Sequence, residues 1–414
     1  MSRASTSCPR AKTGYPNTHP LLSSLTTYLN VMNATKPSFY LHTALGLVLL
    51  MGMSFMAVPT SQAQVSPDID DWSFDVTGAI PVFLNASTHD GLGDDGDDEF
   101  STRVMSGFNP GNITFTVTAP EQNGVTVSGQ FQINHHLQGA STQNDGLFEG
   151  RIADVIIAGD FGTFNVGKGF GIFNSSSIAD EGSAMGIGRF SGPDHDSATL
   201  GRIGAGYNYA NFNPRITYTT PDLNGFVFKA GLINPEKPGP NDPIETAAPR
   251  VEAQLDYTAG FEAGTFQLWA GGLYQNINIK GGDDYALTGF DVGARLNAAG
   301  FGLSGAFSQT QGIGADGIIG SSFDQAEVDA TQWYGEATYD FGGFVLGASY
   351  GEGAQDESDA DDIGSALDNT NQLLMGFARY MVTDQLTLMA EFQDFQSDGQ
   401  ADYNAFILGA QLTF

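Results

Sequence analysis

The feature that most constrains this chain is an alternation of apolar and polar residues with a period of two, which runs from Trp72 to the C-terminus. In the last segment the apolar face holds Phe406, Leu408, Ala410, Leu412 and Phe414. Residues 250–257 repeat the pattern, with charged residues between apolar ones. A period of two predicts β-strands that have one apolar and one polar face.

Short and long connections alternate between these segments. Tight turns are expected at 120–124, 159–162, 221–225, 260–264, 298–300, 342–343 and 382–385, and longer polar connections at 85–99, 138–146, 170–211, 234–248, 276–285, 310–327, 352–371 and 396–402. Up-and-down membrane barrels have short turns on one rim and long loops on the other. Eight long and seven short connections join sixteen strands. We therefore predict an all-β fold, a closed antiparallel barrel in which the first strand (72–84) meets the last (403–414).

The first 63 residues have the character of a targeting segment. Residues 44–58 form an apolar run that ends at Pro59, and the small residues Ser61 and Ala63 follow. This run is shorter than the roughly 20 residues of a membrane-spanning helix, so it is better explained as the core of a signal peptide. We expect an N-terminal extension upstream of the true start at 1–31, a signal peptide at 32–63 and the barrel at 64–414.

The charge balance limits the classes of partner. The chain has 47 acidic and 16 basic residues, for a net charge of −31. A strongly acidic surface repels the negatively charged phosphate backbone, so we expect no nucleic-acid binding. The acidity favours cations as partners. The only cysteine, Cys8, precedes the expected cleavage site, so the mature chain can form no disulfide or cysteine-ligated metal site.

One part of the chain carries a family resemblance. Residues 151–168 are expected to form a strand, a turn bounded by Gly159 and Gly162, and a second strand ending in Gly167-Lys168. A loop of about forty residues leads to a strand starting at Arg215, a Thr-Pro turn and a Gly-Phe strand start. These segments resemble the general porins of Gram-negative outer membranes, which are trimeric sixteen-stranded barrels. The family usually has arginine in place of Lys168, which keeps the charge but loses the planar fork.

The resemblance implies a water-filled channel for passive diffusion of ions and small hydrophilic solutes, with the long third loop folded into the pore. The opposed charges of such a constriction would sieve solutes. The basic wall would comprise Arg103, Arg151, Lys168, Arg202 and Arg215, and the loop acids would be Asp180, Glu181, Asp194 and Asp196. Phe414 would be the assembly signal read by the barrel-assembly machinery. The protein would be a homotrimer in the outer membrane, in contact with lipid and lipopolysaccharide, and the excess of acids predicts a cation preference.

The period of two tests some of these positions independently. Arg215 shares a face with Thr217 and Thr219, opposite Ile216 and Tyr218, as a pore-lining residue should. Asp154, in contrast, falls on the apolar face of its strand. Either a β-bulge or a contact between subunits would accommodate it.

Two acidic, glycine-rich stretches, 90–99 and 356–362, are expected to be solvated outer loops. Hard cations take oxygen ligands, so the alternative is a structural Ca²⁺ site at Asp94, Asp95, Asp97 and Asp98, which could bridge loops to lipopolysaccharide. No other cofactor is expected. The adjacent His135 and His136 would point to opposite faces of a strand, which disfavours joint metal ligation.

Three other functions compete with the diffusion channel. A barrel-shaped outer-membrane hydrolase would need a serine–histidine pair reachable from lipid, and none of the four histidines after residue 63 has a nucleophile motif beside it. A soluble β-sandwich would place its apolar face inward. A substrate-specific channel for sugars would need a file of lumenal aromatics, which the alternation does not show. We therefore expect no enzymatic activity.

Overall fold

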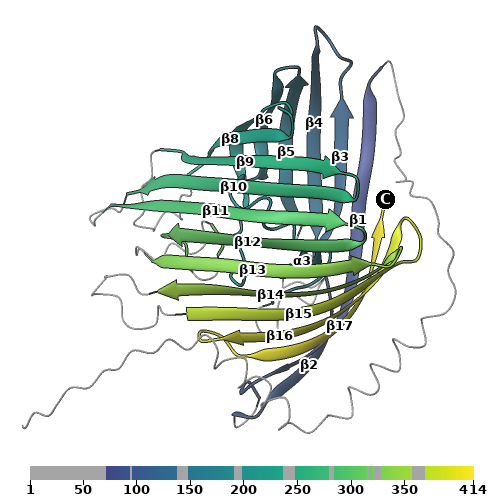
Figure 1. The fold of residues 1–414 in the computed structure, drawn as a ribbon, viewed down its shortest axis with the longest axis vertical. Coiled ribbons are helices and arrows are strands. Elements are labelled where there is room, and N and C mark those ends of the chain that lie inside the picture. The colour runs from purple at the N-terminus through teal and green to yellow at the C-terminus, as the bar shows by residue number, and fades with distance from the viewer. Residues whose placement is uncertain are drawn as a thin grey trace, which may run out of the picture. The chain divides into compact units, whose positions relative to one another are not determined.

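The computed structural model describes residues 71–93, 96–137, 148–190, 198–235, 248–278, 284–314, 317–319, 328–356 and 369–414 (Figure 1). The predicted N-terminal extension and signal peptide, and the boundary expected at residue 64, lie outside this set. Within it, no helix is long and apolar enough to cross a membrane.

Nearly all of the described chain is β-strand. The strands are β1 (Ser73–His89), β2 (Glu99–Met105), β3 (Gly111–Thr118), β4 (Val125–His135), β5 (Phe148–Gly159), β6 (Gly162–Phe170), β7 (Phe212–Thr219), β8 (Phe226–Ile233), β9 (Arg250–Phe261), β10 (Gly264–Ile277), β11 (Tyr285–Ala298), β12 (Phe301–Gln311), β13 (Asp329–Asp340), β14 (Phe344–Asp356), β15 (Asn369–Met381), β16 (Leu386–Ser397) and β17 (Tyr403–Thr413). One short helix, α3 (Glu181–Ala184), lies between β6 and β7.

The strands form one closed antiparallel sheet. Strand β1 pairs with β17 on one edge, from Ala79↔Thr413 to His89↔Tyr403. On its other edge it pairs with β3 along its first half and with β2 along its second half. Since β2 and β3 are two halves of one interrupted wall strand, the seventeen strands fill sixteen wall positions. The predicted barrel, its seam and its alternation of short and long connections are confirmed.

The two faces of the wall have the polarity of a membrane barrel. Apolar side chains such as Leu84, Ile216 and Leu255 are exposed, whereas the intervening Asn85 and Glu252 are buried. A soluble sandwich would have the reverse arrangement, because its apolar face would form the core.

Bulky rings also gather on the outer face near the short turns, in the cross-strand pairs Phe164–Tyr218, Phe226–Tyr257 and Phe301–Tyr339. This agrees with an aromatic girdle at a membrane interface.

A β-bulge in β5 explains the unexpected position of Asp154. The register between β4 and β5 shifts at Gln132/Ile133, where Ile133 pairs with Gly150 and Gln132 pairs with Ile152. Arg151 is the extra residue, and it reverses the facing of the residues that follow. Asp154 therefore points inward and is buried, so the alternative of a subunit contact at this residue is not needed.

Some inward-facing aromatic rings lie across a glycine of the neighbouring strand. Phe83 is the cross-strand partner of Gly409, and a Cβ on Gly409 would come within 2.2 Å of that ring. Trp269 crosses Gly293 in the same way, at 2.1 Å. The glycines leave room for rings that must lie flat against the wall, which accounts for part of the high glycine content.

Candidate functional site

The connection between β6 and β7, residues 171–211, is the third long loop, and its described parts lie against the inner face of the wall from β8 to β17 and of β1 and β2. The backbone N–H groups of Ile172 and Phe173 donate hydrogen bonds to Oε2 of Glu252, at 2.5 and 3.0 Å. The N–H of Asn174 donates to Asp291 at 3.4 Å. Glu252 and Asp291 are inward-facing wall residues that are fully buried. Carboxylates of the wall therefore bind the first backbone N–H groups of the loop.

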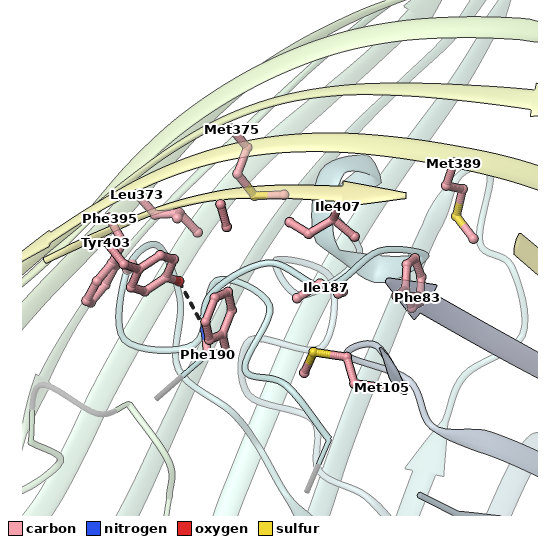
Figure 2. Close-up of a cluster of buried hydrophobic side chains, with 12 residues drawn as sticks. Phe83, Met105, Ile187, Phe190, Leu373, Met375, Met389, Phe395, Tyr403 and Ile407 are labelled. Atoms are coloured by element: carbon pink, nitrogen blue, oxygen red, sulfur yellow. Dashed lines mark hydrogen bonds between the residues drawn. The ribbon is translucent and has the colours of Figure 1, made fainter. Parts of the chain in front are cut away.

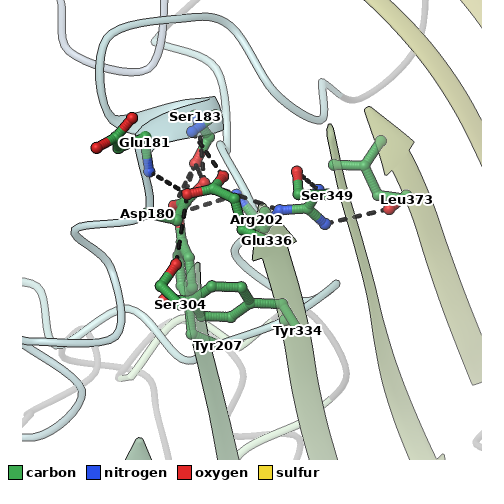
Figure 3. A network of polar contacts seen from close by, with 12 residues as sticks. Asp180, Glu181, Ser183, Arg202, Tyr207, Ser304, Tyr334, Glu336, Ser349 and Leu373 are labelled. Atoms are coloured by element: carbon green, nitrogen blue, oxygen red, sulfur yellow. Dashed lines mark hydrogen bonds and ion pairs between the residues drawn. The ribbon is translucent and has the colours of Figure 1, made fainter. Parts of the chain in front are cut away.

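Helix α3 is held in the same way (Figure 3). The N–H groups of Glu181 and Gly182 donate to the two carboxylate oxygens of Glu336 on β13, at 2.7 and 2.8 Å. The guanidinium of Arg379 on β15 donates to the carbonyl of Gly182 at 3.3 Å. Asp180 caps the helix by accepting the N–H of Ser183 at 2.8 Å. The free N–H groups of a helix start thus meet negative charge from the wall and from the cap.

Asp180 is fully buried at the centre of this network. Its carboxylate accepts the hydroxyls of Ser183, at 2.7 Å, and Tyr207, at 3.0 Å, and Nε of Arg202 lies 3.8 Å away. Burial and the nearby Asp180 charge raise the pKa of Tyr207 well above its usual value. Arg202 also donates to the carbonyl of Leu373 and to Ser349 on the wall. Asp180 and Arg202 therefore form a pair inside the loop, instead of facing each other across the lumen as predicted.

The middle of the loop is anchored by a cluster of buried apolar side chains (Figure 2). Ile187 and Phe190 pack there against wall residues of β1, β2 and β15 to β17. The N–H of Phe190 donates to the hydroxyl of Tyr403 at 3.1 Å, and the N–H of Phe108, between β2 and β3, donates to the carbonyl of Gly186 at 2.9 Å. The described part of the loop thus follows the wall from β8 round to β2.

The remaining predicted loop acids differ in their placement. Glu181 is only partly buried, so its charge can act on the lumen. Asp194 and Asp196 lie outside the described residues.

Two of the predicted wall bases are on the inner face. Arg215 donates to Asp154 at 2.9 Å, and Arg103 is the cross-strand partner of the inward-facing Asn85. Arg151 occupies the bulge, where its Nε lies 2.8 Å from Glu149. Lys168 pairs with the exposed Ala153 and Pro214, so it lies on the outer face, which corrects its predicted place in the pore wall.

Several inward-facing charges were not predicted. Lys229 lies 3.1 Å from Asp256, and Arg250 lies 2.6 Å from Glu252. Arg295 donates to the carbonyl of Ala179 at 2.8 Å. The alternation of polar and apolar residues could have identified two of these charges, because Arg250 and Arg295 both fall on the polar face of their strands.

The predicted calcium ligands are only partly described, since Asp94 and Asp95 lie outside the described residues. Among the residues that are described, no three histidine, cysteine or acidic groups gather as a metal site would require. The calcium site stays a prediction.

Phe414 closes the barrel seam. Its N–H and carbonyl exchange hydrogen bonds with Gly78 at 3.0 and 2.7 Å, and its ring lies against the same glycine. Its role as an assembly signal stays a prediction.

A closed barrel of sixteen wall positions, apolar outside and polar inside, defines an outer-membrane channel. The model of the Gram-negative porin family matches residues 47–413, so the chain belongs to that family. No curated protein sequence matches the chain.

Solved structures share the fold at low sequence identity. The anion-selective porin of Comamonas acidovorans has a TM-score of 0.61 and 16% identity, covering 83% of this chain and 100% of that chain. The DcaP channel of Acinetobacter baumannii has a TM-score of 0.64 and 15% identity, covering 87% and 100%. Salmonella typhi OmpF in complex with daunomycin has a TM-score of 0.59 and 16% identity, covering 84% and 100%.

Membership of this family makes the chain a channel rather than an enzyme. Oγ of Ser87 does lie 3.0 Å from Nε2 of His89. Both side chains are buried on the inner face of β1, so neither could reach a substrate dissolved in lipid.

Proposed function

We propose that this porin is a cation-preferring channel for the passive diffusion of ions and small hydrophilic solutes. The observation that carries the proposal is the separation of charge between the rims and the barrel. Every arginine after residue 63 lies in the barrel wall or the third loop. The connections at both rims hold acids, and outside the third loop their only basic residues are Lys237 and Lys280.

The bases inside the barrel are largely neutralised by their neighbours. Arg215 is paired with Asp154, Lys229 with Asp256 and Arg250 with Glu252. Arg379 lies among acids of the wall and the third loop. The lumen therefore presents little uncompensated positive charge, while both mouths are strongly negative. Negative mouths raise the local concentration of cations and lower that of anions.

The likeness to an anion-selective porin does not oppose this proposal. The two chains share a fold at 16% identity, and fold alone does not set ion preference. Selectivity depends on the charges that line the path, and here Arg215, Lys229 and Arg250 are each paired with an acid.

We further propose that the chain assembles as a homotrimer whose rim meets lipopolysaccharide. A trimer form of Vibrio cholerae OmpT has this fold, with a TM-score of 0.52. Native mass spectrometry of the detergent-extracted protein tests the assembly, and a monomer as the only species would refute it.

The test of ion preference is the reversal potential across a salt gradient, measured on purified protein in a planar bilayer. We expect the sign of a cation-selective pore, with the preference growing as salt is lowered because screening of the rim charges weakens. A reversal potential of the opposite sign would refute the proposal.

A further inference from the structure

A second segment folds into the barrel beside the third loop. It belongs to the connection between β12 and β13, of which residues 312–314 and 317–319 are described. Ile313 and Ile319 are buried in a cluster with Phe173 of the third loop and with Leu273, Ile277, Tyr285 and Leu287 of β10 and β11. The cluster lies inside the barrel, because Tyr274, the neighbour of Leu273, is exposed on the outer face.

This cluster explains an exception to the polar lining. At the long-loop ends of β10 and β11, the inward-facing residues Leu273, Ile277 and Leu287 are apolar. Apolar side chains facing open water would be unfavourable, and full burial of each gains about 1.5–3 kcal/mol. The wall is apolar at the place where the second segment covers it.

The segment also binds the returning limb of the third loop directly. Tyr209 N–H donates to the carbonyl of Gly317 at 2.5 Å, and Ile319 N–H donates to the carbonyl of Tyr209 at 3.1 Å. These bonds form a short parallel bridge between Tyr209 and Ile318. The side chain of Asn211 adds a bond to the carbonyl of Ile319 at 3.4 Å. The returning limb therefore has the wall on one side and this segment on another.

Gly317 makes the close approach feasible. Its φ is +68°, and a Cβ would lie 2.9 Å from the nitrogen of Gly204, 3.1 Å from the carbonyl oxygen of Tyr207 and 2.7 Å from the end of Gln332. Two of these atoms belong to the backbone of the third loop, so a side chain at residue 317 would push the segment and the loop apart.

We propose that the β12–β13 segment is a positioning element that holds the third loop's returning limb and thereby sets the width of the channel. The proposal rests on the chain being a channel but not on its ion preference. A loop bound only to one wall is free to shift into or out of the lumen. Residues 313–314 and 317–319 cover the side of the returning limb that does not face the wall.

The test compares two glycine-to-alanine variants. Gly317→Ala adds a side chain at the contact, whereas Gly342→Ala adds one in a turn where φ is +92° and nothing lies within 4 Å. Both variants place alanine at a positive φ, which strains the backbone, but only Gly317→Ala adds a contact with the third loop. We expect Gly317→Ala to raise single-channel conductance and to admit larger sugars in liposome swelling, while Gly342→Ala behaves as the wild type. Wild-type conductance and sugar exclusion in Gly317→Ala would overturn the proposal.

A disulfide between residues 209 and 318 provides a second test, which fixes the contact between the segment and the loop instead of breaking it. Tyr209→Cys and Ile318→Cys place the thiols on the bridged pair, and the only native cysteine is Cys8. If the segment normally occupies this position, the oxidised channel keeps the wild-type conductance, and oxidation in the Gly317→Ala background restores it. Failure of the disulfide to form, or a conductance below wild type after oxidation, would overturn the proposal. The reversal potential of the same channels tests ion preference separately.

Discussion

The pair formed by Asp154 and Arg215 offers a quantitative test of how the lumen sets selectivity. The two side chains are 3% and 12% exposed and lie 2.9 Å apart. With an effective dielectric constant of about 20, their attraction is about 6 kcal/mol before the cost of desolvation. The two charges therefore act on a passing ion as a compensated pair. Arg215→Gln would leave the Asp154 carboxylate uncompensated, and Asp154→Asn would leave the guanidinium.

An ion that passes about 7 Å from one freed charge interacts with it by about 0.6 kcal/mol in water, close to thermal energy. This changes the local concentration of that ion about threefold, upward for opposite charge and downward for like charge. We expect Arg215→Gln to raise the cation preference and Asp154→Asn to lower it, with the double variant close to wild type. Reversal potentials at low salt measure all three. Shifts of the same sign in both single variants would refute the reasoning, as would a double variant that stays as far from wild type as either single one.

Other variants test the loop, the seam and the wall. Glu181→Gln should lower the cation preference, whereas Asp180→Asn should chiefly increase current noise, because the buried Asp180 carboxylate holds the loop together; equal selectivity shifts would contradict this. Removing Phe414 should reduce insertion into the outer membrane while Phe414→Tyr preserves it, and normal surface levels of the truncated chain would count against the assembly signal. Gly409→Val should displace the aromatic ring that crosses it and cost about 1–3 kcal/mol, seen as a lower temperature of heat-induced mobility change on gels. Gly376→Ala, where the new Cβ meets nothing within 4 Å, is the control and should not change that temperature.

The wall of the barrel was predictable because its determinants are local. A strand with lipid on one side and solvent or loop on the other must alternate, and turns must carry residues that permit them. The alternation could also have corrected the family comparison. Lys168 shares its parity with the outward-facing Phe164 and Val166, so the sequence itself contained the evidence that this lysine does not line the pore.

The bulge at Arg151 and the inside of the barrel were not predictable in the same way. One inserted residue reverses which face of the sheet the following residues of that strand point to. The sequence near Arg151 does not show where the register with the partner strand shifts. The position of helix α3 beside Asp180 depends on Glu336, which lies more than 150 positions away in sequence. No local pattern records such contacts.

The way in which the third loop is anchored bears on how the channel could diversify. Glu252, Glu336 and Glu391 accept hydrogen bonds from loop backbone N–H groups, which every residue except proline provides. These contacts therefore hold the loop backbone in place without depending on which side chains the loop residues carry. Substitutions among the exposed loop side chains can change which solutes the pore admits while the loop keeps its hydrogen bonds to the wall. A barrel of this kind can acquire new permeants by exchange of a few loop residues, without redesign of the strands that support them.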